Sequence, residues 1–247
     1  MPKILKTQGI CLGSQRLRES SKIVTFYTEH HGKLSFIGKG ARNPSSKFGS
    51  ALEIFGLAEL IFYKTERKQV YTLSDAFLID SFSTLKMPDK YLYAHQIVEL
   101  VFRATSLEDP NHKLYLLLHN ALKILDSNHS AKSKNYQSLL SAYYLKVISI
   151  LGFKPELRHC VVCKNPKGAY FSIERGGMVC SSDKHQTTDR TYGIQYINTI
   201  KYLLNTPLSK SLQFSPSQLT LKLAQDYAKY HLENVQINSL QFDPDNK

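Results

Sequence analysis

The stretch KIVTFYT at residues 22–28, followed by EHHG at 29–32 and KLSF at 33–36, decides the fold of the first part of the chain. The first segment is rich in β-branched and aromatic residues, which favour a strand. The last segment alternates polar and apolar residues, as does a strand with one side in solvent. Gly32 can take positive φ in the connection between them. The stretch therefore predicts a β-hairpin.

Three further strands are expected around this hairpin, at residues 4–12, 54–63 and 70–79. Five strands in about eighty residues, with no clear helix among them, predict a small closed or partly closed barrel. An OB-fold, an SH3-like barrel and a small sandwich fit this strand count equally well.

The pattern changes after Met87-Pro88, where apolar residues begin to recur at helical spacing from Tyr91 onward. The chain is therefore expected to contain a β domain at residues 1–82 and a helical domain at residues 83–247.

Further helices are expected within the second domain. One should begin at Asp109-Pro110, with Asp109 as its N-cap, and another should end near Gly152. The segment Ser215-Pro216-Ser217-Gln218 has the form of a capping box, which predicts a last helix that reaches about Leu232.

The chain carries a large positive charge, a formal +12 over 247 residues. Residues 1–50 alone hold nine lysines and arginines against two acidic residues. Such an excess favours polyanionic partners, because each phosphate that is neutralised releases condensed counterions. The alternative is a basic surface that serves only solubility.

No apolar run is long enough to cross a membrane, and the N-terminus lacks the apolar region of a signal peptide. The four cysteines are unevenly spaced and do not resemble a disulfide framework. We therefore expect a cytoplasmic protein with no membrane partner.

A basic segment, KGARNPSSK at residues 39–47, follows the predicted hairpin. Lys39, Arg42 and Lys47 are expected on a loop whose small residues let the backbone approach a phosphate chain closely. Nearby aromatic rings could stack on bases, but at strand positions we expect them in the core; they are Phe36, Phe48 and Phe55. The cations are the candidate contacts, because a core cannot hold unpaired cations.

A candidate metal site begins with the C-x2-C pair Cys160 and Cys163, and Cys180 follows 17 residues later. Two thiolates at this spacing can bind one ion, and the segment between the cysteines resembles the short hairpin of a zinc ribbon. His185 is the preferred fourth ligand, and Asp183, where a second C-x2-C would place a cysteine, is the alternative. The third possibility is another ligand, such as His159 beside Cys160, or a site that holds no metal and serves as a redox pair.

Motifs for catalysis are absent from the sequence. It contains neither a P-loop nor a dinucleotide-binding fingerprint in the required strand–helix context, and it lacks both H-E-x-x-H and the H-x-E element of a deaminase. We therefore expect a protein that is not an enzyme, with any metal in a structural role.

Several motifs, in order along nearly the whole chain, resemble the bacterial recombination mediator RecO family. The likeness is strongest at GKGAR, residues 38–42, where the family has a glycine-rich basic loop after its third strand. The other motifs are TQGICL at 7–12, KIVTFYT at 22–28, HGKL at 31–34, LGFKP at 151–155 and GGMVC at 176–180.

This resemblance implies an α+β multidomain fold, with an N-terminal OB-fold at residues 1–82 and then a helical domain with a zinc-ribbon-like insertion at about 158–187. It implies a DNA repair mediator of the RecF pathway that binds single- and double-stranded DNA and anneals complementary strands. The implied partners are RecR, the acidic C-terminal tail of single-stranded DNA-binding protein and, indirectly, RecA. Nucleoid association in the cytoplasm follows from the same likeness.

The resemblance also assigns residues. Lys39 and Arg42 match the DNA-contacting loop of the family, and we extend the assignment to Lys33 and Lys47 from their charge and position. The three cysteines match three of the family's four metal positions, and Asp183 stands at the fourth, while His185 could restore a complete zinc site.

Two alternatives from other classes remain open. The combination of barrel, ribbon and positive charge also suits an RNA-binding or ribosome-associated protein, which would prefer structured RNA over single-stranded DNA. A metalloenzyme would need a zinc ion with three protein ligands and an exchangeable water.

Overall fold

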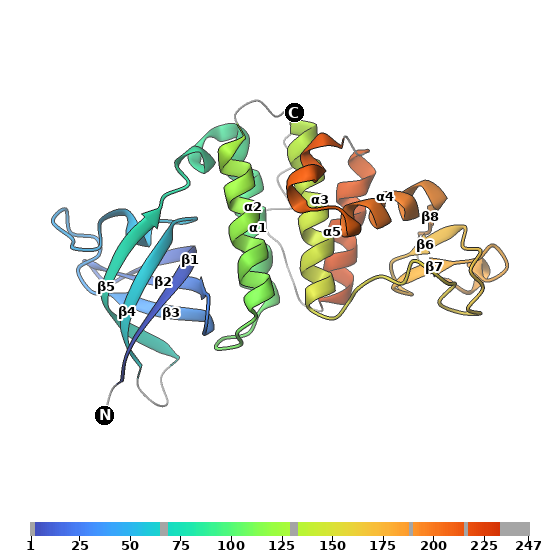
Figure 1. The fold of residues 1–247 in the computed structure, drawn as a ribbon. Helices are drawn as coiled ribbons and strands as arrows, with labels where there is room; N and C mark the ends of the chain where they lie inside the picture. The colour runs from blue at the N-terminus through green and yellow to red at the C-terminus, as the bar shows by residue number, and fades with distance from the viewer. Residues whose placement is uncertain (1–2, 65–68, 129–132, 188–189, 215–216, 233–247) are drawn as a thin grey trace. The chain divides into compact units, whose positions relative to one another are not determined.

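The structure is a computed structural model that describes residues 3–64, 69–128, 133–187, 190–214 and 217–232 (Figure 1). It divides the chain into two compact units, the first ending at Ser127 and the second beginning at Asn128. The first unit contains five strands and two α-helices, and the second contains three α-helices and a small sheet. The domain boundary expected between residues 82 and 83 stays a prediction.

The first unit opens with five strands that close into a barrel in the order β1-β2-β3-β5-β4. The strands are β1 (Lys3–Leu17), β2 (Ser21–Thr28), β3 (Gly32–Gly38), β4 (Leu57–Lys64) and β5 (Val70–Asp80). All neighbours are antiparallel except β3 and β5, which pair in parallel over residues 35–37 and 70–72. A closed barrel of five strands is the architecture of an OB-fold, so the predicted N-terminal fold is confirmed.

Strand β1 closes the barrel because it pairs with two neighbours. Its residues 3–10 lie opposite β4, and its residues 9–17 lie opposite β2. A β-bulge between Cys11 and Gly13 shifts the register with β2, and a bulge bends the strand that carries it. One strand of 15 residues can therefore pair with two neighbouring strands, β4 and β2.

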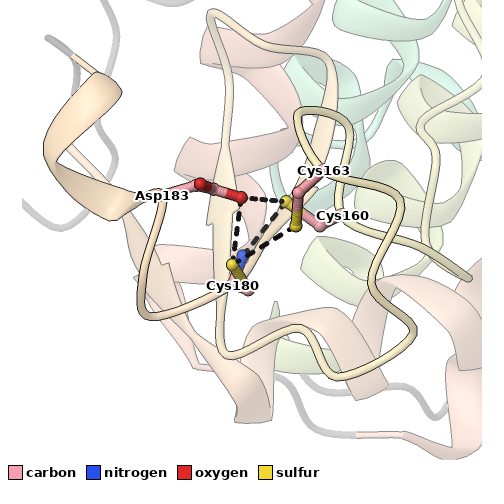
Figure 2. A group of neighbouring side chains, drawn as sticks. All are labelled: Cys160, Cys163, Cys180 and Asp183. Atoms are coloured by element: carbon pink, nitrogen blue, oxygen red, sulfur yellow. Dashed lines mark hydrogen bonds between the residues drawn. The ribbon is translucent and has the colours of Figure 1, made fainter.

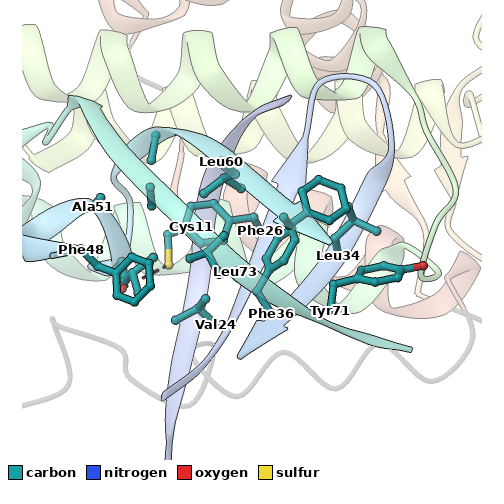
Figure 3. Close-up of a cluster of buried hydrophobic side chains, with 14 residues drawn as sticks. Cys11, Val24, Phe26, Leu34, Phe36, Phe48, Ala51, Leu60, Tyr71 and Leu73 are labelled. Atoms are coloured by element: carbon teal, nitrogen blue, oxygen red, sulfur yellow. Dashed lines mark hydrogen bonds between the residues drawn. The ribbon is translucent and has the colours of Figure 1, made fainter. Parts of the chain in front are cut away.

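The interior of the barrel is filled by alternate side chains of the strands (Figure 3). The Phe36 ring packs edge-to-face against Phe62 and Phe26, with centroids 5.0 and 6.0 Å apart. Burying one such ring contributes about 1.5–3 kcal/mol. Phe48 belongs to the same core and Phe55 is fully buried. The expectation that these phenylalanines are core residues, rather than stacking platforms, is confirmed for Phe36, Phe48 and Phe55.

The predicted hairpin is confirmed as β2 and β3, and its tip is tightly packed. The Thr28 hydroxyl accepts a hydrogen bond from the His31 N–H at 3.1 Å and donates one to the Gly32 carbonyl at 2.8 Å. Gly32 has a φ of +66°, and a Cβ atom there would lie 2.2 Å from the carbonyl oxygen of Asp109. Only glycine satisfies both conditions.

Helices α1 (Pro88–Ala104) and α2 (His112–Ser127) complete the first unit, with 3-10 turns η1 (Gly49–Leu52) and η2 (Ser83–Lys86). Pro88 lies in the first turn of α1, where its missing N–H costs nothing. The expected Asp109 cap of α2 is wrong. Asn111 caps this helix instead, because its Oδ1 accepts a hydrogen bond from the Leu114 N–H at 3.1 Å, while Asp109 packs against the hairpin tip.

Lys33, at the start of β3, joins the barrel to the end of α1. Its ammonium donates hydrogen bonds to the carbonyls of Phe102, at 2.6 Å, and of Thr105. Carbonyls in the last turn of a helix have no intrahelical partner, so Lys33 satisfies groups that would otherwise need water. Burial lowers the pKa of Lys33, and the charge of Arg103 lowers it further.

The second unit consists of helices that pack on one another and a small sheet that lies beside α4. Its elements are α3 (Ser133–Ile150), β6 (Tyr170–Ser172), β7 (Gly177–Val179), η3 (Lys184–Gln186), β8 (Tyr192–Gly193), α4 (Ile194–Asn205), η4 (Leu208–Gln213) and α5 (Gln218–His231). The sheet has the order β7-β6-β8. The third and last predicted helices are therefore confirmed as α3 and α5. Two residues of the predicted capping box, 215 and 216, lie outside the described residues.

Among the described residues, no helix combines the length and the apolar character that a membrane crossing requires.

We predict that Gly32→Ala destabilises the protein more than Gly49→Ala. Both glycines have positive φ, +66° and +48°, which costs an L-residue about 1–2 kcal/mol. Only at Gly32 does the added Cβ meet backbone atoms, whereas nothing lies within 4 Å of it at Gly49. Urea unfolding of the two variants measures the difference, and equal losses would show that the hairpin tip is not packed as described.

We also predict that Lys33→Met lowers the free energy of unfolding by about 1–3 kcal/mol, because two carbonyls lose their donor. The matched control is Lys39→Met, at the other end of β3, where the side chain is exposed and the change should stay within about 0.5 kcal/mol. Urea or thermal unfolding compares them, and a Lys33→Met variant as stable as the control contradicts the structural role.

Candidate nucleic-acid interface and metal centre

The pairing of β1, β2 and β3 places basic residues at one end of the barrel. Arg16 lies opposite Lys22, and Lys22 lies opposite Gly38, so the end of β1, the start of β2 and the end of β3 meet in one row. The basic segment, here called the cationic loop (residues 39–47), leaves β3 directly after Gly38. The β1–β2 turn, residues 18–20, is at the same end.

Arg42 fixes the cationic loop to the β1–β2 turn. Its backbone N–H donates to the Ser20 carbonyl at 2.9 Å. Its guanidinium donates to the carbonyls of Glu19 and Arg18, at 2.8 and 3.2 Å. The Arg42 side chain is exposed and its hydrogen-bond acceptors are neutral carbonyls, so the guanidinium keeps its charge at the surface.

The other two cations of the loop differ in their pairing. Lys39 is exposed and forms no ion pair with any residue in the described parts of the chain. The Lys47 ammonium lies 3.0 Å from Asp75 Oδ1 on β5. That hydrogen bond lowers the pKa of Asp75. Lys47 is therefore paired with a carboxylate, whereas Lys39 and Arg42 form no ion pair with a carboxylate in the described parts of the chain.

Lys33 is not brought together with these residues. It begins β3 whereas Lys39 follows the end of the strand, and six residues of strand span about 20 Å. Its ammonium is engaged by the Phe102 and Thr105 carbonyls. The structure thus places Lys39, Arg42 and Lys47 on one loop, and Lys33 at the junction with α1. A DNA contact by Lys33 stays a prediction.

Arg16 and Arg18 are two further cations at this end of the barrel that were not predicted as site residues. Both are exposed and lie at the end of β1 and in the β1–β2 turn, and the loop between the first two strands is a ligand-binding loop of OB-folds. The signal in the sequence was the basic pair itself, placed just before the first strand of the hairpin.

The second candidate site is the thiol cluster, defined as Cys160, Cys163, Cys180 and Asp183. One ligand atom from each of the four residues lies within 4.8 Å of the others. Asp183 Oδ2 accepts hydrogen bonds from the thiols of Cys160 and Cys180 at 3.2 and 3.1 Å, and the sulfurs of Cys163 and Cys180 are 3.7 Å apart (Figure 2).

Two tight turns position the cluster. In the first, the Lys164 N–H donates to the Cys160 carbonyl at 2.9 Å, which folds the C-x2-C segment back on itself. In the second, the Asp183 N–H donates to the Cys180 carbonyl at 3.2 Å. The second turn follows β7 directly, and the Val161 N–H donates to the Met178 carbonyl of β7 at 2.8 Å. One strand thus supports both turns.

The carboxylate of Asp183 controls the electrostatics of the cluster. Hydrogen bonds from the thiols, that of Cys163 foremost, lower the pKa of Asp183, and the same carboxylate raises the pKa of Cys163 to about 12. Burial opposes ionisation of Cys160, but backbone N–H donors outweigh it and lower its pKa. The thiols donate to one carboxylate, and binding of a metal to their sulfurs would release the thiol protons.

Three sulfurs and one carboxylate oxygen are donors that Zn²⁺ accepts in four-coordinate sites. Among the described residues, the set that could hold a metal contains Asp183, and His185 is outside it. Asp183 stands at C-x2-D spacing from Cys180, the same spacing as in the first turn. The structure thus brings together the three predicted cysteines with the alternative fourth ligand.

Two family models match the chain. One, "Recombination protein O N terminal", matches residues 1–82, and the other, "Recombination protein O C terminal", matches residues 86–241.

Curated relatives carry the same name. A DNA repair protein RecO of Thermoanaerobacter sp. (strain X514) is 30% identical over 238 residues, which cover 94% of each chain. One from Chlorobium limicola is 29% identical over 259 residues, covering 95% of each chain. One from Prosthecochloris aestuarii is 29% identical over 187 residues, covering 71% of this chain and 69% of its own.

The two models together cover almost the whole sequence and meet where the barrel gives way to helices. The family consists of DNA repair mediators and not of catalytic enzymes, in agreement with the lack of catalytic motifs in the sequence. The chain therefore belongs to the RecO family of DNA repair proteins.

Proposed function

We propose that this protein is a recombination mediator whose barrel binds single- and double-stranded DNA through the cationic loop. It anneals complementary strands and, with RecR, helps to load RecA onto DNA coated by single-stranded DNA-binding protein. The observation that carries the proposal is the fixed position of the loop: Arg42 holds it beside the β1–β2 turn, next to Arg16 and Arg18.

The chemistry of this surface favours contact with the backbone of DNA over reading of its bases. Its cations suit phosphate oxygens, which carry no sequence information. The phenylalanines that could have stacked on bases, Phe36, Phe48 and Phe55, are buried. Binding should therefore vary little with sequence and fall steeply with salt.

Annealing follows from the same arrangement. Two strands repel each other through their phosphates, and a cationic surface that holds one strand by its backbone reduces that repulsion. The base edges stay free to pair with a second strand, because the protein leaves them uncontacted. Annealing needs no covalent step, which agrees with a family that does not consist of catalytic enzymes.

The remaining partners are proposed on charge and family. A chain with a formal charge of +12 attracts the acidic C-terminal tail of single-stranded DNA-binding protein. RecR is proposed as a partner, and RecA as an indirect one, from membership of the family. We propose a cytoplasmic, nucleoid-associated location, where such a repair reaction takes place.

We propose further that the thiol cluster binds one structural Zn²⁺. The four protein donors would complete its coordination, which is the count of a structural site, whereas a catalytic one keeps an open position. The ion would link the two turns that flank β7 and so stabilise the insertion. The proposed ligands are Cys160, Cys163, Cys180 and Asp183, and His185 is the competing fourth ligand.

We predict that Lys39→Glu with Arg42→Glu weakens binding to a single-stranded oligonucleotide about 25-fold at 0.1 M salt. Loss of two phosphate contacts should also make the slope of log K against log salt shallower by about 1.4. Fluorescence anisotropy across a salt titration measures both, with strand annealing followed on the same samples. The loss should be similar for oligonucleotides of different sequence.

The matched control is Lys113→Glu with Lys210→Glu, which makes the same change in net charge at exposed lysines on α2 and η4. Arg42→Lys, which keeps the charge, should lose less affinity than Arg42→Glu. If the loop variant and the control lose affinity equally, the cationic loop is not the binding site. A stronger preference for structured RNA than for DNA would favour the RNA-binding alternative.

For the metal site, we predict that the purified protein contains about one zinc ion per chain, and that Co²⁺ substitution gives a thiolate-to-metal charge-transfer band. Asp183→Ala should weaken metal binding and Asp183→Cys should retain it. His185→Ala should leave zinc content unchanged. Zinc loss in His185→Ala but not in Asp183→Ala would make His185 the fourth ligand. If the purified wild-type protein contains no zinc and does not bind added Co²⁺, the metal site is excluded.

A further inference from the structure

The second unit contains a cavity that neither the cationic loop nor the thiol cluster explains. It has a volume of about 640 Å³ and opens between α5, β8 and the turn that joins β6 to β7. The cavity, here called the α5 pocket, is lined by Ile173 and by seven polar or aromatic residues: Glu174, Arg190, Tyr192, Lys222, Asp226, Lys229 and Tyr230. The volume falls within the range of small-ligand sites, about 300–1,000 Å³.

The walls of the α5 pocket are held firmly. His231 Nε2 lies 2.7 Å from the Ile173 carbonyl in the β6–β7 turn. The Tyr227 hydroxyl donates to the carbonyls of Phe153 and Gly176, at 3.2 and 3.4 Å. Tyr227 and His231 lie one helical turn apart on α5, so this face of the helix is fixed to the turn.

The adjacent face of α5 carries the pocket side chains. Lys222, Asp226, Lys229 and Tyr230 follow the helical period. Lys222 and Lys229 are exposed, and neither forms an ion pair with a residue in the described ranges. Tyr230 is 52% exposed, and its ring packs edge-to-face against His231 with centroids 5.0 Å apart.

The opposite wall combines a cation with a second ring. The Arg190 guanidinium lies 5.5 Å from the centroid of Tyr192, and Tyr192 is only 6% exposed. Three cations and two tyrosines therefore surround one space, together with the carboxylates of Glu174 and Asp226. Phosphates suit the cations, a base suits the exposed ring, and the N–H groups of a base can donate to the carboxylates.

We propose that the α5 pocket is a second contact site for single-stranded DNA, which takes one nucleotide with its base against Tyr230 and its phosphates on Lys222 and Lys229. This inference rests on the proposed function and extends it, because Phe36, Phe48 and Phe55, the rings considered for stacking near the cationic loop, are buried. An acidic peptide would meet the same lysines, but it would leave the exposed Tyr230 ring without a stacking partner.

The first test uses the absence of tryptophan from the chain. Tyr230→Trp introduces a single tryptophan at the proposed stacking position and keeps the aromatic ring. We expect an oligo-dT to quench its fluorescence as binding saturates, because a stacked base quenches indole. A synthetic Asp/Glu-rich peptide should leave the emission unchanged. Saturated DNA binding without quenching, or quenching by the peptide alone, would overturn the proposal.

The second test uses affinity. Lys222→Glu with Lys229→Glu should weaken oligo-dT binding about 25-fold at 0.1 M salt and reduce the salt slope by about 1.4. Tyr230→Ala should weaken binding at least fivefold without changing the salt slope, because stacking releases no counterions. The control is again Lys113→Glu with Lys210→Glu, which has the same net charge. Circular dichroism and thermal unfolding check that each variant folds.

The two proposals fail in different ways. If the loop variant, Lys39→Glu with Arg42→Glu, loses affinity but the pocket variant behaves as the control, the α5 pocket is not a DNA site and the proposed function stands. If the pocket variant loses affinity and the loop variant does not, the assignment of the barrel fails. If the wild-type protein binds no DNA, both fail.

Discussion

The bend in β1 is the constraint from which the rest of the barrel unit follows. Because a bulge at residues 11–13 lets one strand pair with both β4 and β2, the sheet closes and a core of alternating side chains forms inside it. Closure also fixes which strand ends lie together. It brings the β1–β2 turn to the end of β3, and so places Arg16 and Arg18 beside a basic segment more than twenty residues further along the chain.

Local patterns in the sequence predicted much of this unit. Strand periodicity located the hairpin, and the basic segment was correctly placed on a loop after it. The thiol cluster was largely visible as well, because cysteines at C-x2-C spacing indicate turns that direct sulfurs to one point. These features depend on residues close in sequence, where propensity and spacing carry the information.

Features that depend on distant contacts could not be predicted. Lys33 resembles any exposed strand lysine, and its carbonyl partners are about 70 residues away. The N-cap of α2 is Asn111 and not the predicted Asp109. Asp109 packs against the hairpin tip, a contact that the local sequence does not show. Ligand chemistry alone favoured His185 over Asp183. The structure places Asp183 among the sulfurs because Asp183 follows Cys180 at the C-x2-D spacing and its N–H closes the turn on the Cys180 carbonyl.

Arg42 has one further consequence, which concerns the entropy of binding. A free arginine loses much of its rotamer freedom when a ligand immobilises it, at a cost of about 0.5–1.5 kcal/mol. Here the guanidinium is already ordered by two peptide oxygens, so most of that loss is incurred when the chain folds. Lys39 has no such restraint and must be ordered by its partner. Arg42 and Lys39 carry the same formal charge on one loop, but Arg42 loses less side-chain conformational entropy on binding. The same contact therefore costs Arg42 less entropy than it costs Lys39.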